Sequence, residues 1–437
     1  MRPRRLPPLA LALILGLLLA PPTASGQSDG ALASTTAQAP DSSTVERARI
    51  LLDEVPLVDG HNDLPWQIRE KAGGDLDSLD ISEAQPDLHT DIARLEEGQV
   101  GAQFFAAYVP ADMIADGATR FALMQIDLIH RLVDRYPDTF AFARTVADIE
   151  KAHAEGRIAA LIGVEGGHAI EGSLDVLRAL YDLGARYMTL THWQSHAWAD
   201  AATDDPIHQG LTPFGEKVVR EMNRLGMLVD LSHVSDSTMM DVLRITEAPV
   251  IYSHSSARAL AGHVRNVPDA ILPEVARNGG IVMVNFAPAF ISEEVKVHAA
   301  LADSDSLRTA LTGDSAQTRK AWLEENPAPR ATLSQVADHV DHIVEVAGID
   351  HVGLGSDYDG IDAVPVGLED VSTFPALVAE LLRRGYSDED IRKLAGLNFL
   401  RVMRGAEAVS ARLREERGPY VGTISPEVMR PEDEPSP

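Results

Sequence analysis

The chain contains no cysteine in its 437 residues. This absence excludes disulfides, thiolate metal ligands, a cysteine nucleophile and a lipid-modified cysteine. A chain of this length can still bury a core large enough for stability without disulfides. Any metal ligand or catalytic group must therefore come from other residue types.

Basic residues are outnumbered, with 38 lysines and arginines against 66 aspartates and glutamates and a formal net charge of −28. Nucleic acids and anionic membrane surfaces are also negatively charged, so neither is expected as a partner. The hydrophobic fraction of 45% and the charged fraction of 24% are ordinary for a globular protein.

The hydrophobic run near the N-terminus, residues 9–19, is too short to span a bilayer comfortably. Arg2, Arg4 and Arg5 precede it, and prolines and small residues follow it as far as Gly26. This order is that of a secretory signal peptide, predicted as residues 1–26, and it implies export to the periplasm or the extracellular space. An uncleaved anchor is the less favoured alternative.

The amino-acid composition predicts the boundaries of a linker, a domain and a C-terminal tail. Residues 27–42 are rich in Ser, Thr, Ala and Gln and are predicted to be a flexible linker. Residues 43–410 are predicted to form a single domain. The acidic, proline-rich residues 411–437 form a tail that we expect to be disordered or to lie along the surface. Such a hydrophilic tail is no membrane-anchor signal.

Short apolar or β-rich runs alternate with amphipathic helical stretches along this domain. Such alternation favours a parallel sheet, and eight runs favour a closed, TIM-like (β/α)8 barrel. An open doubly wound sheet is the rival, but no Gly-x-Gly-x-x-Gly follows the first run and there is no phosphate loop. The predicted strands are Leu57–Asp63, Gly101–Val109, Ala159–Glu165, Ala185–His192, Met227–His233, Pro249–His254, Gly280–Phe286 and His351–Asp357.

Helix start signals fall between these runs. Residues 287–350 separate the last two strands. An insertion is predicted around 287–330, and its charged part, 293–325, is expected to form a lid or a partner surface. The predicted N-caps are Ser43 for a helix over 44–54, Ser173, Thr212 before Pro213, Thr332 or Ser334, and Ser387 with Asp390 in a capping-box arrangement.

Histidines and carboxylates gather at the ends of the predicted strands. In a barrel of this kind the C-terminal strand ends meet on one face, where active sites lie. Taken singly, a histidine at the edge of a core is usually only hydrogen-bonded, and an acidic residue there can be a turn former or a helix cap. Seven such residues at the ends of six strands, all on one face, favour a metal site instead. These residues are His61, Asp63, Glu165, His192, His233, His254 and Asp357.

Three imidazoles and three carboxylates exceed the needs of one tetrahedral zinc ion and match a two-metal site. Glu165 is the best bridge, because its strand lies between the His61–Asp63 pair and the later histidines. One ion is then expected on His61, Asp63 and Glu165, and the other on Glu165, His233 and His254. These ligands suit two Zn²⁺, although manganese or cobalt could substitute.

Two bound metals would lower the pKa of a bridging water, which makes metal-assisted hydrolysis the expected reaction class. Asp357 remains outside the predicted ligand set. It is placed to take the proton of that water and to pass it to a leaving amine.

The chain resembles the membrane dipeptidase (renal dipeptidase) family of the amidohydrolase-like barrels. The resemblance runs in family order from about residue 45 to 405. The matching stretches are Asp-Gly-His-Asn-Asp-Leu-Pro-Trp (59–66), Gly-Ala-Gln-Phe-Phe (101–105), Glu-Gly-Gly (165–167), Leu-Thr-His (190–192), Asp-Leu-Ser-His-Val-Ser (230–235), Ser-His-Ser-Ser-Ala (253–257), Arg-Asn-Val-Pro-Asp (265–269), Gly-Ser-Asp-Tyr-Asp-Gly (355–360) and Asn-Phe-Leu-Arg-Val (398–402).

The resemblance implies a zinc-dependent (β/α)8 dipeptidase that acts on free L,L and in some members L,D dipeptides. It implies that His192 stabilises the oxyanion, that Arg265 binds the substrate carboxylate and that Asp357 transfers the proton. A homodimer is typical of the family. Two alternatives stay open: another binuclear amidohydrolase, such as an N-acyl-amino-acid deacylase or lactonase, and a non-catalytic, metal-stabilised binding protein.

Overall fold

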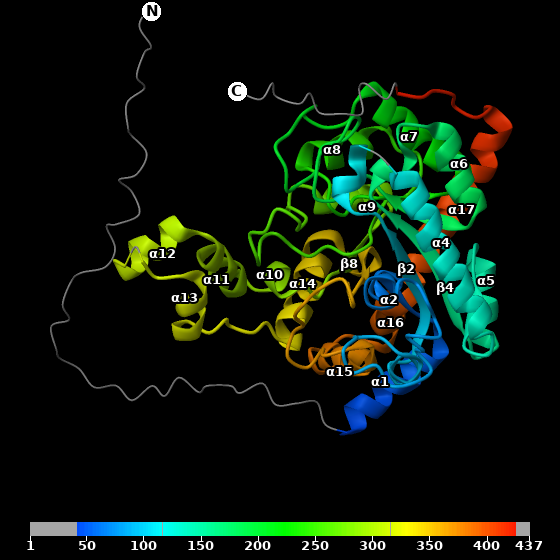
Figure 1. Cartoon of the computed structure of the whole chain (residues 1–437). Helices are drawn as coiled ribbons and strands as arrows, with labels where there is room; N and C mark the ends of the chain where they lie inside the picture. Colours follow the sequence, from blue (N-terminus) through cyan, green and yellow to red (C-terminus); the bar gives the residue numbers. More distant parts are fainter. Residues whose placement is uncertain (1–41, 116, 315, 425–437) are drawn as a thin grey trace, which may run out of the picture. The chain divides into compact units, whose positions relative to one another are not determined.

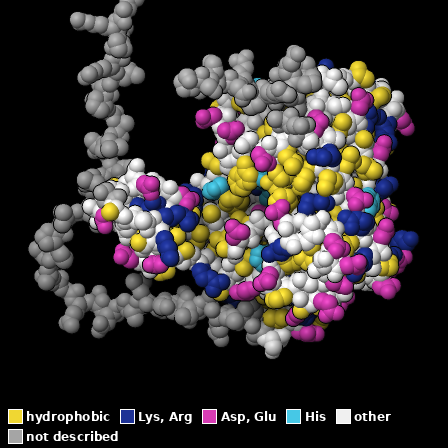
Figure 2. Space-filling view, viewed as in Figure 1, with side chains coloured by type: hydrophobic (Ala, Val, Ile, Leu, Met, Phe, Trp, Pro, Cys, Tyr) yellow, Lys and Arg dark blue, Asp and Glu magenta, His cyan; other side chains and the backbone are white. Residues whose placement is uncertain are grey.

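The computed structural model describes residues 42–115, 117–314 and 316–424. The predicted signal peptide, the linker up to residue 41 and the tail beyond residue 424 lie outside the described residues. Within the described part, no helix has both the length and the apolar character needed to cross a membrane. Figure 2 shows acidic and basic side chains interspersed over the visible face.

Eight parallel strands close into a barrel, as predicted from the alternating pattern (Figure 1). Around the barrel the order is β1, β2, β4, β5, β6, β7, β8, β9, and the pairing of β9 with β1 and of β2 with β4 completes the circle. The strands are β1 (Leu57–Asn62), β2 (Val100–Tyr108), β4 (Ile158–Glu165), β5 (Ala185–Thr189), β6 (Leu228–Asp230), β7 (Ile251–Tyr252), β8 (Ile281–Val284) and β9 (Val352–Leu354).

A ninth strand, β3 (Phe140–Phe142), was not predicted from the sequence. It pairs with the first residues of β4, with Phe140 opposite Ile158. β5 pairs with the later residues of β4, from Ile162 onward. Since β2 pairs along the other edge of β4, β3 and β5 share one edge and β3 stays outside the closed barrel.

Several barrel strands end earlier than predicted. β5, β6, β7 and β9 stop before His192, His233, His254 and Asp357, which lie in the loops that follow. The backbone explains two of these corrections, because His233 and Asp357 have φ angles of 68° and 67°. Residues in this left-handed region cannot continue a β-ladder.

Most of the helices begin where the capping residues predict. The prediction of Ser43 as the N-cap of a helix over 44–54 is wrong, because α1 already includes Ser42 and Ser43 lies within it. The side chains of Ser173, Thr212 and Ser387 accept the expected backbone N–H bonds, and the first residue of α14 follows Thr332 rather than Ser334. The helices between the strands are α1 (Ser42–Glu54), α2 (Leu64–Ala72), α3 (Ile92–Glu97), α4 (Ala118–Arg135), α5 (Val146–Ala154), α6 (Leu174–Asp182), α7 (Pro213–Leu225), α8 (Asp236–Ile245), α9 (Leu272–Asn278), α10 (Pro288–Ile291), α14 (Leu333–Ala347), α15 (Phe374–Arg383), α16 (Asp388–Arg392) and α17 (Asn398–Glu416).

The long connection between β8 and β9 is helical in its charged part. It forms α11 (Glu293–Asp303), α12 (Asp305–Thr312) and α13 (Arg319–Glu325) after α10. α11 packs against α10, and α12 and α13 pack against α11 (Figure 1). Trp322 is buried within this group, so the insertion has a small interior of its own.

The domain boundary expected at residue 410 is wrong, because α17 continues to Glu416. The chain after it follows the surface for at least a few residues. The Leu174 N–H donates to the Gly422 carbonyl, and the Ile424 N–H donates to the Gly172 carbonyl. This part of the tail is therefore fixed next to the start of α6.

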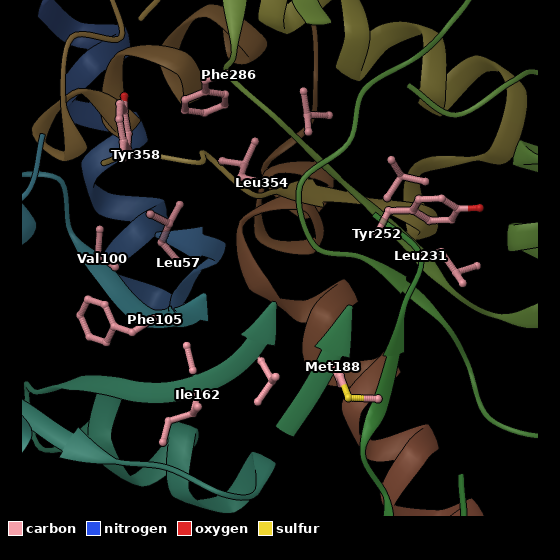
Figure 3. Close-up of a cluster of buried hydrophobic side chains, with 14 of the residues drawn as sticks. Leu57, Val100, Phe105, Ile162, Met188, Leu231, Tyr252, Phe286, Leu354 and Tyr358 are labelled. Atoms are coloured by element: carbon pink, nitrogen blue, oxygen red, sulfur yellow. The ribbon is translucent and has the colours of Figure 1, made fainter. Parts of the chain in front are cut away.

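Two apolar layers follow from the alternation of side chains along each strand. Leu57, Phe105 and Ile162 point outward into the layer between the barrel and its helices (Figure 3). Their neighbours Val58, Phe104 and Leu161 belong to a second cluster inside the barrel, together with Phe399 of α17. Burying this much apolar surface holds the strand ends, and the side chains that follow them, in fixed relative positions.

Candidate metal centre and active site

The seven strand-end residues singled out in the sequence come together at the C-terminal end of the barrel. Glu165 is the last residue of β4 and His61 lies near the end of β1, whereas the others lie in the loops after their strands. The carboxylate of Glu165 is at the centre. Oε1 of Glu165 lies 3.0 Å from Nε2 of His233, 3.5 Å from Nε2 of His254 and 3.7 Å from Nε2 of His192, and Oε2 lies 3.5 Å from Nε2 of His61.

A second carboxylate approaches the same histidine. Oδ2 of Asp63 lies 3.1 Å from Nε2 of His61. Asp63 is not in the strand but at the N-cap of α2, and the pairing of β1 with β2 is irregular between Asp59 and Asn62. The two side chains therefore converge as predicted, but through a break in the strand rather than through regular alternation.

Asp357 completes a second acidic group with His61 and Asp63, their ligand atoms all lying within 4.8 Å of one another. Its Oδ2 accepts a 2.8 Å hydrogen bond from Nδ2 of Asn285. Gly360 makes this packing possible. A Cβ at that position would lie 2.2 Å from Oδ2 of Asp63 and 2.6 Å from Oδ1 of Asp357.

Outer hydrogen bonds orient two of the imidazoles. Nδ1 of His61 lies 2.8 Å from the hydroxyl of Tyr187, which donates to the Gly60 carbonyl. Nδ1 of His254 lies 2.8 Å from Oγ of Ser253, which donates to Asp230 at 2.6 Å. Because both hydroxyls already donate elsewhere, they accept the Nδ1–H of each ring, and both Nε2 lone pairs face the carboxylates.

This arrangement fits divalent metals. Lone pairs of imidazole nitrogen aimed at carboxylate oxygens repel one another unless a cation lies between them. Histidine whose Nδ1–H is held by an oxygen is the usual form of a metal ligand, and mixed nitrogen and oxygen ligands suit zinc, manganese or cobalt. The residues able to hold the metals are His61, Asp63, Glu165, His192, His233, His254 and Asp357.

Burial and neighbouring charges shift the pKa values of the site. Burial lowers the pKa of His233 and His254 well below the usual value, and nearby cationic groups lower it further. Burial also acts to lower the pKa of His61, but Tyr187, Glu165 and Asp63 together raise it well above its usual value. The carboxylates therefore favour a positive charge at the position of His61. His233 and His254 remain neutral, as metal ligands must be.

A cavity of about 280 Å³ opens above the cluster. Arg265 is fully buried in its wall, 5.3 Å from the ring of Phe290, and its guanidinium lies 3.4 Å from the His254 carbonyl and 3.5 Å from Oγ of Ser255. Nε of Arg265 has no hydrogen-bond partner in the described part of the chain. Burial lowers the pKa of Arg265 to about 10, so the side chain stays charged at neutral pH.

Comparison with known proteins identifies the family of the chain. The model of the membrane dipeptidase family (peptidase family M19) matches residues 45–417. The chain belongs to this family. The membrane dipeptidase family model thus spans the whole barrel and all of α17, and the family resemblance expected from the motifs is confirmed.

Individual proteins are similar to the chain over most of their length. Dipeptidase verJ of Clonostachys rogersoniana is 43% identical over 382 residues, which are 85% of this chain and 89% of the relative. A metallo peptidase from Rhodobacter sphaeroides, solved with a phosphinate mimic of the dipeptide L-Ala-D-Ala, is 27% identical with a TM-score of 0.67 over 80% of this chain and 99% of its own. The probable dipeptidase PvdM from Pseudomonas aeruginosa has the same fold, with a TM-score of 0.73 at 24% identity over 84% of this chain and 99% of its own.

Sequence reasoning missed the residues that support the ligands. Asn285, Tyr187 and Asp230 sit on or just after barrel strands, and each contacts a site residue or its neighbour from another strand. Asp230 carried a signal, since it precedes His233 in Asp-Leu-Ser-His. Tyr108 at the end of β2 also lines the cavity, and it lies opposite Glu165 in the strand register.

Proposed function

We propose that the protein is a metal-dependent dipeptidase that binds two Zn²⁺ and hydrolyses free L,L and L,D dipeptides. The observation that carries this proposal is the buried convergence of four imidazoles on Glu165 at the floor of a small cavity that is also lined by Arg265 and Asp357. The family, the dipeptidase relative and the dipeptide mimic in the Rhodobacter sphaeroides enzyme support the same substrate class.

The chain's own residues hold the metals in two sets. As expected from the sequence, His61, Asp63 and Glu165 would bind one ion, and Glu165, His233 and His254 the other, so Glu165 would be shared. The ligand atoms that lie close together form the groups His61–Glu165–His254, Glu165–His192–His233 and His61–Asp63–Asp357. When bound, the two ions supply the polarisation that activates a water for attack at neutral pH. The outer contacts of His61 and His254 keep these rings from turning away.

Arg265 binds the substrate's C-terminal carboxylate. A guanidinium presents paired donors that match a carboxylate, and a buried one with weak existing contacts gains most from such a partner. Its contacts at 3.4 and 3.5 Å are long, and Nε has no partner in the described residues. A substrate carboxylate that binds here accepts hydrogen bonds from the guanidinium N–H groups that lack a close partner.

Asp357 and His192 act on the scissile bond. Burial raises the pKa of Asp357 to about 7, so the carboxyl can both accept and return a proton near neutral pH. Burial lowers the pKa of His192 well below its usual value. The ring is therefore neutral and carries one N–H, which donates to the oxyanion that forms on the carbonyl.

A metal-reconstitution screen tests this function. The protein is stripped with a chelator, reloaded with Zn²⁺ and assayed with L,L and L,D dipeptides, while bound zinc is measured. We expect two zinc ions per chain and turnover that requires them. Asp357→Asn should abolish most of the turnover while it retains zinc, whereas the control Asp362→Asn, at an exposed position nearby, should behave like the parent. Zinc-loaded protein without turnover of any dipeptide would overturn the proposal.

We also propose that the protein is exported, on the basis of residues 1–26. Expression of the full chain in a host with a secretory pathway should give a mature product that starts after residue 26. The mass of the protein recovered outside the cytoplasm measures this, and an intact N-terminus on cytoplasmic protein would contradict it.

A further inference from the structure

The cavity above the metal centre has an apolar wall that the proposed reaction does not use. The charged side chains that line it are Asp63, Glu165, Asp357 and Arg265, all of which already have roles. The remaining lining residues outside the histidines are Trp66, Tyr108, Trp193, Ala287, Phe290, Gly360 and Ile361. This composition leaves no charged partner for a substrate side chain.

The aromatic residues form a continuous row along one side. The rings of Trp66 and Tyr108 are 4.9 Å apart, those of Tyr108 and His192 are 4.8 Å apart, and those of His192 and Trp193 are 5.2 Å apart. Each pair meets edge to face. The row therefore continues from α2, through the end of β2, to the loop after β5 without a gap.

The order of the strands places this row relative to Arg265. Tyr108 ends β2, and Arg265 follows β7, which is four strands away in either direction around the barrel. β2 and β7 are therefore opposite each other. A dipeptide whose carboxylate is held by Arg265 extends across the mouth toward Tyr108, so its amino-terminal residue lies beside the aromatic row.

Trp193 is the most exposed member of the row. Its side chain is 44% exposed at the mouth of the cavity. Its backbone is fixed, because Oγ1 of Thr203 donates a 2.7 Å hydrogen bond to its carbonyl, and its ring also meets His233 edge to face at 5.2 Å. A large indole held rigidly at a site entrance offers apolar area at little entropic cost.

We propose that Trp193 is a specificity-determining residue, which packs against the side chain of the substrate's amino-terminal residue and selects large apolar side chains. The proposal rests on the dipeptidase function proposed above. Covering one leucine-sized side chain is sufficient for a preference of about tenfold.

The test compares Leu-Gly with Gly-Gly and Gly-Leu, using zinc-loaded full-length protein. For the parent we expect kcat/KM for Leu-Gly to exceed that for Gly-Gly by about tenfold, mainly through KM. Trp193→Ala should reduce this ratio to near one, and Trp193→Phe should give an intermediate ratio. The matched control is Ile207→Ala, an exposed apolar residue of the same loop that does not line the cavity, and its ratio should equal that of the parent.

Each other outcome counts against the proposal. If Trp193→Ala lowers kcat/KM for Leu-Gly and Gly-Gly by the same factor, Trp193 only supports His192 and His233. If Trp193→Ala instead lowers kcat/KM for Gly-Leu relative to Gly-Gly, Trp193 contacts the carboxy-terminal residue, and the proposed orientation of the dipeptide is wrong. Absence of turnover with all three dipeptides in the zinc-loaded parent would instead refute the dipeptidase function itself.

Discussion

Nε2 of His233 lies 3.0 Å from Nε2 of His254, and both atoms face Oε1 of Glu165. The Nδ1–H of His254 is held by Ser253, so its Nε2 carries a lone pair. At this distance the two Nε2 atoms and the carboxylate oxygen repel one another unless a proton or a cation lies between them. The loops after β6 and β7 therefore provide two nitrogen ligands of a candidate metal site, and β4 provides the carboxylate.

Removing the hydroxyl that orients His61 should weaken metal binding without unfolding the barrel. In Tyr187→Phe the ring still fills the interior, but Nδ1 of His61 loses its 2.8 Å partner. We expect metal affinity to fall by about 10- to 100-fold, as is usual when such a partner is lost. Competition with a chelator measures this. Tyr252→Phe is the control, since that buried hydroxyl has no partner among the described residues, and equal affinities in the two variants would contradict the role of Tyr187.

Gly360→Ala should damage catalysis more than stability. The added Cβ would lie 2.2 Å from Oδ2 of Asp63 and 2.6 Å from Oδ1 of Asp357, so both carboxylates must shift. A displacement of this size in a catalytic group costs about a hundredfold in rate. Steady-state kinetics with a zinc-loaded sample measure the loss, and thermal unfolding provides the comparison. Gly418→Ala serves as the control because nothing lies within 4 Å of its Cβ, and parent-like rates in Gly360→Ala would show that the site tolerates the shift.

The barrel and most of the site could be predicted because their signals are local. Six of the eight barrel strands end in, or are closely followed by, a His, Asp or Glu, and the parallel fold alone brings those ends together. Ser173 and Thr212 start helices through hydrogen bonds to residues only three positions away. The family resemblance then supplied Arg265, for which the sequence around it carries no pattern of its own.

The parts that could not be predicted depend on contacts between distant segments. β3 is only Phe-Ala-Phe, and it becomes a strand because β4 offers a free edge there. The partners of His61 and Asp357 are Tyr187 and Asn285, which are far away in sequence and meet them only after the barrel closes. Similarly, the positive φ of His233 ends its strand early, and no composition rule anticipates a histidine in that conformation.

Acid should destabilise the protein in part through His339 of α14. Its Nδ1 accepts a 3.0 Å bond from the Ala257 N–H, its Nε2 donates to the Ile291 carbonyl at 3.0 Å, and burial lowers its pKa from 6.5 to about 4. Because the folded pKa lies below the unfolded one, this stability is complete above about pH 6.5 and is lost as the pH falls toward 4.

The loss assigned to His339 amounts to about 3 kcal/mol in the free energy of unfolding over that range. The variant His339→Asn should be less stable at pH 7 and should lose less on acidification than the parent. Denaturant unfolding at pH 7, 5.5 and 4 measures the difference between the two proteins. Identical pH dependence in both would show that other buried groups account for the acid sensitivity.

Arg265→Lys should weaken substrate binding while it leaves the metals in place. A lysine keeps the charge but cannot present two parallel donors to a carboxylate, which costs about 1.5–3 kcal/mol and therefore raises KM by roughly 10- to 100-fold. Arg258→Lys is the matched control, because Arg258 lies on the same loop but pairs with Asp236.

The decisive comparison uses a dipeptide amide, which lacks the carboxylate. The parent should bind it as poorly as Arg265→Lys does, because the interaction that the guanidinium supplies is then missing from both. If Arg265→Lys instead lowers turnover of the dipeptide and its amide equally, the guanidinium supports the architecture of the site, and a substrate without a free carboxylate, such as a lactone, becomes the better hypothesis.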